Sequence, residues 1–170
     1  MILVFDTYYF ENKAKTVCIA FENWDESEKF DIYSEIIDGI EDYRSGEFHK
    51  RELPCILSLY NKINIGKIDT IIIDGFVFLD DNNKLGLGGH LYNSLDQKIP
   101  VIGVAKTNFA TIAKNKRDLL RGNSIKPLYI TAVGMDLDEA YDKIEKMSGD
   151  NRIPTLLKTV DTISKEIPVS

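Results

Sequence analysis

The stretch TIIIDGFVFLDDNNKLGLGGHLY, from Thr70 to Tyr92, contains a run of β-branched residues that ends abruptly at an aspartate and a glycine. A short continuous run of this kind is typical of a strand that is buried on both faces. The segment GGHLYNSL, which begins inside the quoted stretch and ends just after it, predicts a helix. PVIGVAK predicts a second buried strand. Two such strands joined through a helix indicate a parallel crossover, with Asp74 at the end of its first strand.

The flanking segments extend this unit to one predicted domain over residues 1–170, in a chain with 44% hydrophobic residues. Before it, MILVFD, KTVCIAFE and KFDIYSEII predict an antiparallel meander of three strands. ELPCILSLYNKI then predicts a helix that begins near Glu52, with Pro54 in its first turn. After it, PLYITAVG predicts a strand, and DLDEAYDKIEKM and IPTLLKTVDTISKEI predict two helices. The fold class is therefore α/β, with a mixed sheet flanked by helices.

The composition argues against a membrane-spanning or exported chain. No run of about 18 uncharged apolar residues occurs, and the apolar N-terminal segment has no basic flank. We therefore expect a cytoplasmic protein with no membrane partner. Cys18 and Cys55 lie far apart in unrelated contexts, which favours buried, reduced thiols over a disulfide or a metal cage.

Charge is unevenly distributed along a chain whose net charge is −6. Nine acidic residues and one lysine lie between Glu22 and Asp42, whereas six basic residues and one acid lie between Lys106 and Lys126. The acidic total argues against a generic nucleic-acid binder, but a basic segment can follow a phosphate backbone. Lys114, Lys116 and Arg117 are the candidates for that role. A solvated loop is the alternative interpretation.

Three carboxylates are predicted to meet at one edge of the sheet. Asp6 ends or nearly ends the first predicted strand, Asp74 ends the strand TIIID, and Glu52 stands at the start of the first helix. Oxygen ligands alone suit a hard cation such as Mg²⁺ or Mn²⁺. Each residue also has a structural interpretation. Asp6 opens a turn into TYYF, Asp74 and Gly75 form a turn, and Glu52 interacts with the helix N-terminus.

Several segments occur in an order that is characteristic of one family. They are FDTYY, YRSGEFHKRE, IIIDG, LGLGGHL, IPVIGVAK, KPLYITAVGMDLDEA and RIPTLLKTVDTIS. In order and spacing they resemble the endonuclease V (deoxyinosine 3′ endonuclease) family, which has a ribonuclease H-like fold. The resemblance covers essentially Ile2 to Lys165.

This resemblance implies a metal-dependent endonuclease that hydrolyses a phosphodiester bond near a deaminated base, inosine, in nucleic-acid repair or processing. Asp6, Glu52 and Asp74 would be catalytic and would hold Mg²⁺, with Mn²⁺ as a substitute. Lys106 would offer its charge to the scissile phosphate, and Asp161 matches a family position near the metal site. The structural alternatives are a surface lysine at Lys106 and a solvated helix position at Asp161.

The partner implied is single-stranded or lesion-containing DNA or RNA, with the altered base extruded into a pocket. Tyr43 would stack in the space left behind, and Gly46, Gly88 and Gly89 would permit close backbone approach. His90 would join this substrate-binding set, although a core histidine hydrogen-bonded to a carbonyl is the alternative interpretation.

The chain also departs from the family pattern. Family members usually carry an additional N-terminal helix. The family's strand-separating wedge corresponds to Asp42–Ser45 here, and only its tyrosine is kept. The acidic segment LDDNN replaces the basic residues that usually follow Asp74. Two other interpretations therefore remain open. One is a catalytically degenerate ribonuclease H-like module that binds nucleic acid or protein, and the other is a metal-dependent nuclease with a different substrate, such as inosine-containing RNA or branched DNA. The oligomeric state is not predicted.

Overall fold

The computed structural model, which describes residues 1–40, 48–109 and 111–168, contains seven strands and four helices within those residues. In chain order they are β1 (Ile2–Phe10), β2 (Lys13–Phe21), β3 (Asp31–Asp38), α1 (Phe48–Tyr60), β4 (Thr70–Asp74), α2 (Leu87–Ser94), β5 (Val101–Ala105), β6 (Arg117–Leu119), β7 (Leu128–Val133), α3 (Leu137–Glu145) and α4 (Thr155–Ser164). This order matches the predicted one except for β6. That short strand lies in the basic segment between Lys106 and Lys126, for which the sequence predicts no strand.

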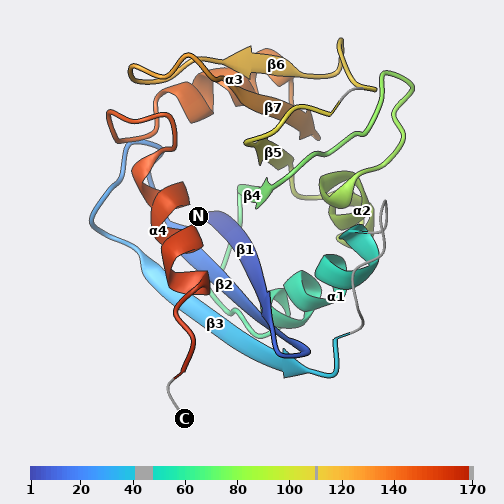
Figure 1. The fold of residues 1–170 in the computed structure, drawn as a ribbon, viewed down its shortest axis with the longest axis vertical. Coiled ribbons are helices and arrows are strands. Elements are labelled where there is room, and N and C mark those ends of the chain that lie inside the picture. The colour runs from blue at the N-terminus through green and yellow to red at the C-terminus, as the bar shows by residue number, and fades with distance from the viewer. Residues whose placement is uncertain (41–47, 110, 169–170) are drawn as a thin grey trace.

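All seven strands form one mixed sheet in the order β3-β2-β1-β4-β5-β7-β6 (Figure 1). The strands β1, β2 and β3 form the expected antiparallel meander. Strand β4 pairs in parallel with β1 and with β5, which confirms the predicted crossover through α2. Strand β7 then pairs antiparallel with both β5 and β6. The mixed α/β sheet predicted from the sequence is therefore confirmed.

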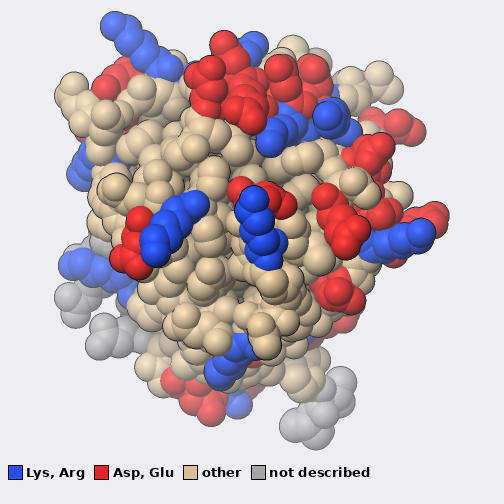
Figure 2. Space-filling view, turned by 180° about the vertical axis from the view of Figure 1, so that it is seen from behind, with Lys and Arg blue, Asp and Glu red and all other residues tan. Residues whose placement is uncertain are grey.

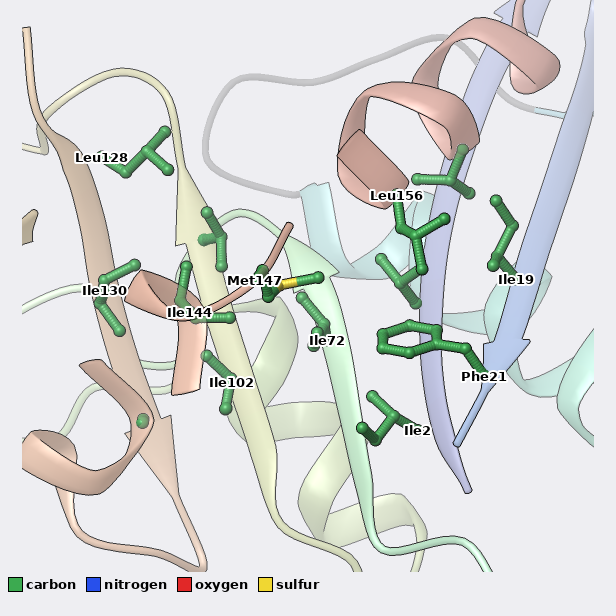
Figure 3. Packing of buried hydrophobic residues seen from close by; sticks show 14 of the residues in the cluster. Ile2, Ile19, Phe21, Ile72, Ile102, Leu128, Ile130, Ile144, Met147 and Leu156 are labelled. Carbon is green, nitrogen blue, oxygen red and sulfur yellow. The ribbon is translucent and has the colours of Figure 1, made fainter. Parts of the chain in front are cut away.

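Helices cover both faces of the sheet, as Figure 1 shows, with α1 and α2 on one side and α4 on the other. On the α4 side, which α3 also covers, strand residues such as Ile72 and Ile102 pack against Ile144 of α3 and Leu156 of α4 (Figure 3). On the opposite side, residues including Phe5 and Ile71 pack beneath α1 and α2. The central strands are buried on both faces because their β-branched residues fill both cores.

Strand β1 is longer than predicted. It continues past Asp6 to Phe10, and it pairs with β2 along its whole length, from Ile2 opposite Phe21 to Phe10 opposite Lys13. The turn follows Phe10, where Glu11 and Asn12 both have positive φ. The prediction that β1 ends at or near Asp6 is therefore wrong, and so is the interpretation of Asp6 as the start of a turn. The aromatic residues after Asp6 extend the strand because β2 supplies a partner for each of them.

Helix α1 begins earlier than predicted, at Phe48 rather than near Glu52. Pro54 consequently lies inside the helix, although its missing N–H group favours the first turn. The apolar residues of α1 that follow, such as Ile56, are buried in the core, and this packing outweighs the local preference of Pro54. Glu52 is therefore within the helix and not at its N-terminus.

Cys18 and Cys55 are buried free thiols, as the sequence predicts. Burial raises the pKa of both thiols. Within the described ranges, the helices are too short and too polar to cross a membrane.

Candidate active site

Asp6 and Asp74 lie side by side because of the register of β1 and β4. The parallel pairing of these strands ends with Phe5 opposite Ile73, and each aspartate is the next residue along its strand. Side chains alternate between the faces of a sheet, and Ile72, two residues before Asp74, packs in the core on the α4 side. Both carboxylates therefore lie on the α4 side of the sheet, at the point where the β1–β4 ladder ends.

Strand β5, which pairs with β4, adds the positively charged Lys106 to the same end of the sheet. Lys106 follows the last residue of β5, and the same alternation through Ile102 and Val104 directs it to the α4 side. Its Nζ lies 3.9 Å from Oδ1 of Asp161, a residue of α4 whose side chain is only 14% exposed. Lys106 thus stands directly after the strand that VIGVAK predicts, and its role toward a phosphate remains a prediction.

A small cavity of about 30 Å³ connects these groups. Its polar lining comes from Asp6, Asp74, Lys106 and Asp161, and its remaining lining is apolar. A cavity needs about 10–15 Å³ of such space to hold one water molecule, so this volume is sufficient. The strand ends and α4 thus enclose a site large enough for a single ion or water.

The carboxylates are held in surroundings that disfavour their charge. Burial and the neighbouring charge of Asp74 raise the pKa of Asp6 to about 6, although a hydrogen bond from Ser164 opposes the shift. Asp74 is exposed to solvent at the strand end, yet the protein packed around its carboxyl group raises its pKa, while Lys106 lowers it. Such crowding is relieved by a bound cation, and perturbed carboxylates in a cleft are typical of functional sites.

Asp161 differs from the other carboxylates because cations surround it. Its Oδ1 lies 3.1 Å from Nζ of Lys165, and Lys106 and Lys158 approach within 4.0 Å. Although burial raises the pKa of Asp161, the hydrogen bond from Lys165 and the charge of Lys106 keep it below its usual value. Asp161 is therefore ionised at neutral pH and holds Lys106 at the edge of the cavity.

Glu52 reaches this edge from the opposite face of the sheet, where α1 packs. Burial, followed by the charges of Asp6 and Asp74, raises the pKa of Glu52 to about 8. The three predicted carboxylates are therefore electrostatically coupled. Nevertheless, across the described part of the chain, no group of three or more His, Cys, Asp or Glu side chains is arranged to hold a metal ion. A single cation shared by all three carboxylates remains a prediction.

The turn after Asp74 is clamped onto β5 and β7. Gly75 has φ of +131°, a conformation that L-residues with a side chain rarely adopt. The buried Thr131 hydroxyl accepts a 2.9 Å hydrogen bond from the Val77 N–H group, and a Cβ at Gly103 would lie 2.6 Å from the Gly75 carbonyl oxygen. The Asp74 carboxylate itself receives no hydrogen bond from the described residues, so the turn does not depend on it.

Two predicted substrate-binding glycines have a packing role. A Cβ on Gly88 would lie 2.7 Å from Cγ2 of Val77, and one on Gly89 would lie 2.7 Å from the Val77 carbonyl oxygen. These glycines allow α2 to pack directly on the segment that follows Asp74. His90 is partly buried on the same helix. Tyr43 and Gly46 lie outside the described residues.

The basic segment lies at the far edge of the sheet from β1. Lys116 pairs with Asp118 at 2.7 Å, and Arg117 pairs with Asp138 at 2.8 Å and stacks on Tyr141 at 3.7 Å. Lys114 is exposed on the loop before β6. Among the described side chains on the face in Figure 2, acidic and basic residues lie next to one another and form no continuous basic surface. In the sheet, β5 and β7 lie between β4 and β6, so the strand that begins at Arg117 is not next to the strand that carries Asp74.

Ser164 is a residue of this site that the sequence analysis missed. It is fully buried at the end of α4, and its hydroxyl donates a 2.9 Å hydrogen bond to Oδ2 of Asp6. The spacing from Asp161 could have indicated it, because residues three apart share a helix face. Its contact with Asp6, 158 residues away in sequence, follows only from the docking of α4 on β1.

A family model described as endonuclease V matches residues 1–162 of the chain. No curated protein matches the sequence significantly.

Solved structures share the fold of this chain. Endonuclease V from Bacillus subtilis is 21% identical with a TM-score of 0.71, and the match covers 96% of this chain and 77% of that one. Human ENDOV is 19% identical with a TM-score of 0.75, covering 96% and 82%. Endonuclease V from Ciona intestinalis, in complex with a 23mer DNA containing an inosine followed by a ribo-adenosine, is 16% identical with a TM-score of 0.78, covering 96% and 83%. At these identities the likeness establishes the fold.

Proposed function

Because the chain belongs to the endonuclease V family, we propose that it is an endonuclease that uses a divalent cation to hydrolyse a phosphodiester bond near inosine in DNA or RNA. The observation that carries the proposal is the convergence of Asp6, Asp74 and Lys106 at one edge of three neighbouring strands. Strand pairing places Asp6 and Asp74 next to each other, and the alternation of side chains along β5 directs Lys106 to the same face.

Asp6 and Asp74 are the proposed principal ligands of the cation, and their chemistry fits that role. Their oxygens suit Mg²⁺ or Mn²⁺, and their raised pKa values indicate crowding that a cation relieves. When bound, such a cation lowers the pKa of an attacking water and offsets charge that builds on the phosphate. Glu52 is the proposed third carboxylate, and it approaches the same edge from α1. Mg²⁺ is the physiological ion that we propose, with Mn²⁺ as its substitute.

Lys106 is proposed to place its ammonium group against the scissile phosphate. The group is 40% exposed, so substrate can reach it, and Asp161 holds it at 3.9 Å on the cavity side. A positive charge fixed before reaction stabilises negative charge that develops on the phosphate without reorganising during the step. Asp161 then acts through Lys106, while its own ion pairs keep it charged.

Inosine is proposed as the recognised base because relatives with this fold have been solved with inosine-containing DNA. An enzyme that tests an altered base extrudes it from the stack and recognises its edge in a pocket. Tyr43, Gly46 and His90 remain the candidates for that recognition. Lys114, Lys116 and Arg117 are weaker candidates for backbone contacts, because two of them are paired with acidic neighbours. The chain is proposed to act as a single domain in the cytoplasm.

The direct test is a cleavage assay on four matched oligonucleotides. Single-stranded DNA and RNA of identical sequence would each carry one inosine or one adenosine at the same position. We expect cleavage close to inosine in Mg²⁺ and in Mn²⁺, and none in excess chelator. The ratio of the DNA and RNA rates then identifies the preferred substrate.

Two other results would contradict parts of this proposal. Equal cleavage of the inosine and adenosine strands would indicate a nuclease without lesion recognition. Binding of the strands without cleavage in either metal would favour the degenerate binding module. The absence of a three-carboxylate group among the described residues gives that second interpretation its support.

A further inference from the structure

Ser164, the last residue of α4, has no solvent exposure and contacts the candidate site directly. Its Oγ lies 2.9 Å from Oδ2 of Asp6 and 2.8 Å from the carbonyl oxygen of Asp161. A hydroxyl group has one proton, so it can donate to only one of these oxygens at a time. An ionised carboxylate is the stronger acceptor, and the proton is therefore donated to Asp6.

This hydrogen bond distinguishes the two oxygens of Asp6. Oδ2 is held toward α4 by Ser164, whereas Oδ1 accepts no hydrogen bond from the described residues. The carboxylate therefore cannot rotate freely, and its unengaged oxygen stays available at the cavity that Asp6 lines with Asp74.

The end of α4 is itself anchored to the sheet. Lys15 of β2 donates hydrogen bonds to the carbonyl oxygens of Ile163 and Glu166, at 2.9 and 2.6 Å. A lysine at this point satisfies carbonyl groups that a helix end leaves without partners. Because β2 pairs with β1 beside Asp6, the hydroxyl and the carboxylate are both fixed on the same rigid framework.

We infer that Ser164 is a positioning residue that fixes the Asp6 carboxylate so that Oδ1 is presented to the divalent cation. The inference rests on the proposed function, which makes Asp6 a metal ligand. Ser164 itself touches neither the cation nor the substrate. Groups that orient a metal ligand in this way typically change metal affinity or activity by about 10- to 100-fold when they are removed.

The test compares Ser164→Ala with Thr162→Ala. Thr162 lies on the same helix, is exposed, and donates a 2.9 Å hydrogen bond to the Lys158 carbonyl oxygen, so it controls for the loss of a hydroxyl from α4. The dissociation constant for Mn²⁺ is measured by calorimetry without nucleic acid. The Mn²⁺ concentration for half-maximal cleavage of a deoxyinosine oligonucleotide is measured separately. Thermal unfolding reports whether each variant is folded.

Ser164→Ala should weaken Mn²⁺ binding by about 10-fold and raise the Mn²⁺ requirement for cleavage to match, with the rate recovering at high Mn²⁺. Thr162→Ala should behave as wild type. If folded Ser164→Ala binds Mn²⁺ as tightly as wild type, or if Thr162→Ala loses as much affinity, the inference is wrong. If Ser164→Ala does not fold, Ser164→Cys replaces it in the test, because cysteine keeps the volume but is only a weak hydrogen-bond donor. The same results then confirm or contradict the inference. A wild-type protein that binds no Mn²⁺ would instead contradict the proposed function.

Discussion

Two regions that attract attention in the sequence turn out very differently in the structure: the group formed by Asp6, Asp74 and Lys106 on three adjacent strands, and the basic segment around β6. In the first region, residues from three distant segments converge where the β1–β4 pairing ends, and the two aspartates are left without a lysine or arginine in a salt bridge among the described residues. In the basic segment, Lys116 and Arg117 are neutralised by Asp118 and Asp138.

The difference shows what kind of sequence signal identifies a site. A high density of one charge along the chain says little, because the fold supplies opposite charges from neighbouring strands and helices. A charged residue placed directly after a buried β-branched run is more informative, because pairing and alternation determine where its side chain lies. The two regions therefore make opposite predictions for substitution.

The largest expected effect is on cleavage by Asp74→Asn. This change keeps the shape of the side chain and removes its charge, so cleavage should fall by at least about 100-fold, since even partners of a metal ligand are worth 10- to 100-fold. The protein should remain folded and become no less stable, because one of several crowded carboxylates is neutralised. Single-turnover cleavage and thermal unfolding measure the two effects.

Asp118→Asn provides the matched control in the basic segment. It makes the same chemical change but removes only a surface partner of Lys116. Asp118 is 51% exposed and pairs with a lysine remote from β4, so the cleavage rate at saturating substrate should change by less than about fivefold. Equal losses in the two variants would remove the distinction between the regions.

The second prediction concerns stability without metal. The pKa of Asp6 is raised from 3.8 to about 6, and that of Glu52 from 4.5 to about 8, so the folded state retains protons that the unfolded state releases. This contribution to stability is complete below the unfolded pKa values and is lost as the pH rises through the folded ones. The unfolding free energy of wild type relative to Asp6→Asn should therefore fall between about pH 4 and pH 6.

Denaturant unfolding at a series of pH values measures this difference. Mn²⁺ binds the deprotonated carboxylates, so it should stabilise wild type increasingly above about pH 6 and Asp6→Asn much less. A wild-type advantage that grows with pH in the absence of metal would show that Asp6 is stabilised as a charged group by the fold.

The smallest effect is expected in the basic segment. Replacing Lys114, Lys116 and Arg117 together by alanine should weaken nucleic-acid binding only slightly. The slope of log K against log salt should change by less than about 0.7, the value for one phosphate contact on a single strand. Binding titrations at several salt concentrations measure it, and a change equivalent to three contacts would show that the acidic neighbours release these cations to the substrate.

The sequence predicts the central part of the fold because its signals there are local. The runs TIIID and VIGVA contain enough β-branched residues to identify β4 and β5. Asp74 is the last residue of the first run and Lys106 follows the second, so the runs also locate these two side chains. The same reasoning fails for β1, whose extension to Phe10 depends on pairing with β2. It also misses β6, a strand of three residues that exists because β7 offers a partner.

The candidate site is predicted less completely than the fold. Asp6 is identified although its strand is predicted too short, because its position relative to β4 depends only on the register. Ser164 is not identified, since its hydrogen bond to Asp6 requires α4 to dock on β1. Glu52 is predicted at a helix start and instead lies inside α1, so it approaches the aspartates from the face of the sheet that α1 covers.

The most direct test of the account is the position of Mn²⁺ in crystals of the protein, located by its anomalous scattering. We expect a peak at the edge of the cavity between Asp6 and Asp74, with an oxygen of each about 2.0–2.2 Å away, close to the distance that Mg²⁺ demands. Oδ1 of Asp6 should be the ligand, with Oδ2 still bonded to Ser164. A fully occupied Mn²⁺ bound elsewhere, with this edge empty, would contradict the account.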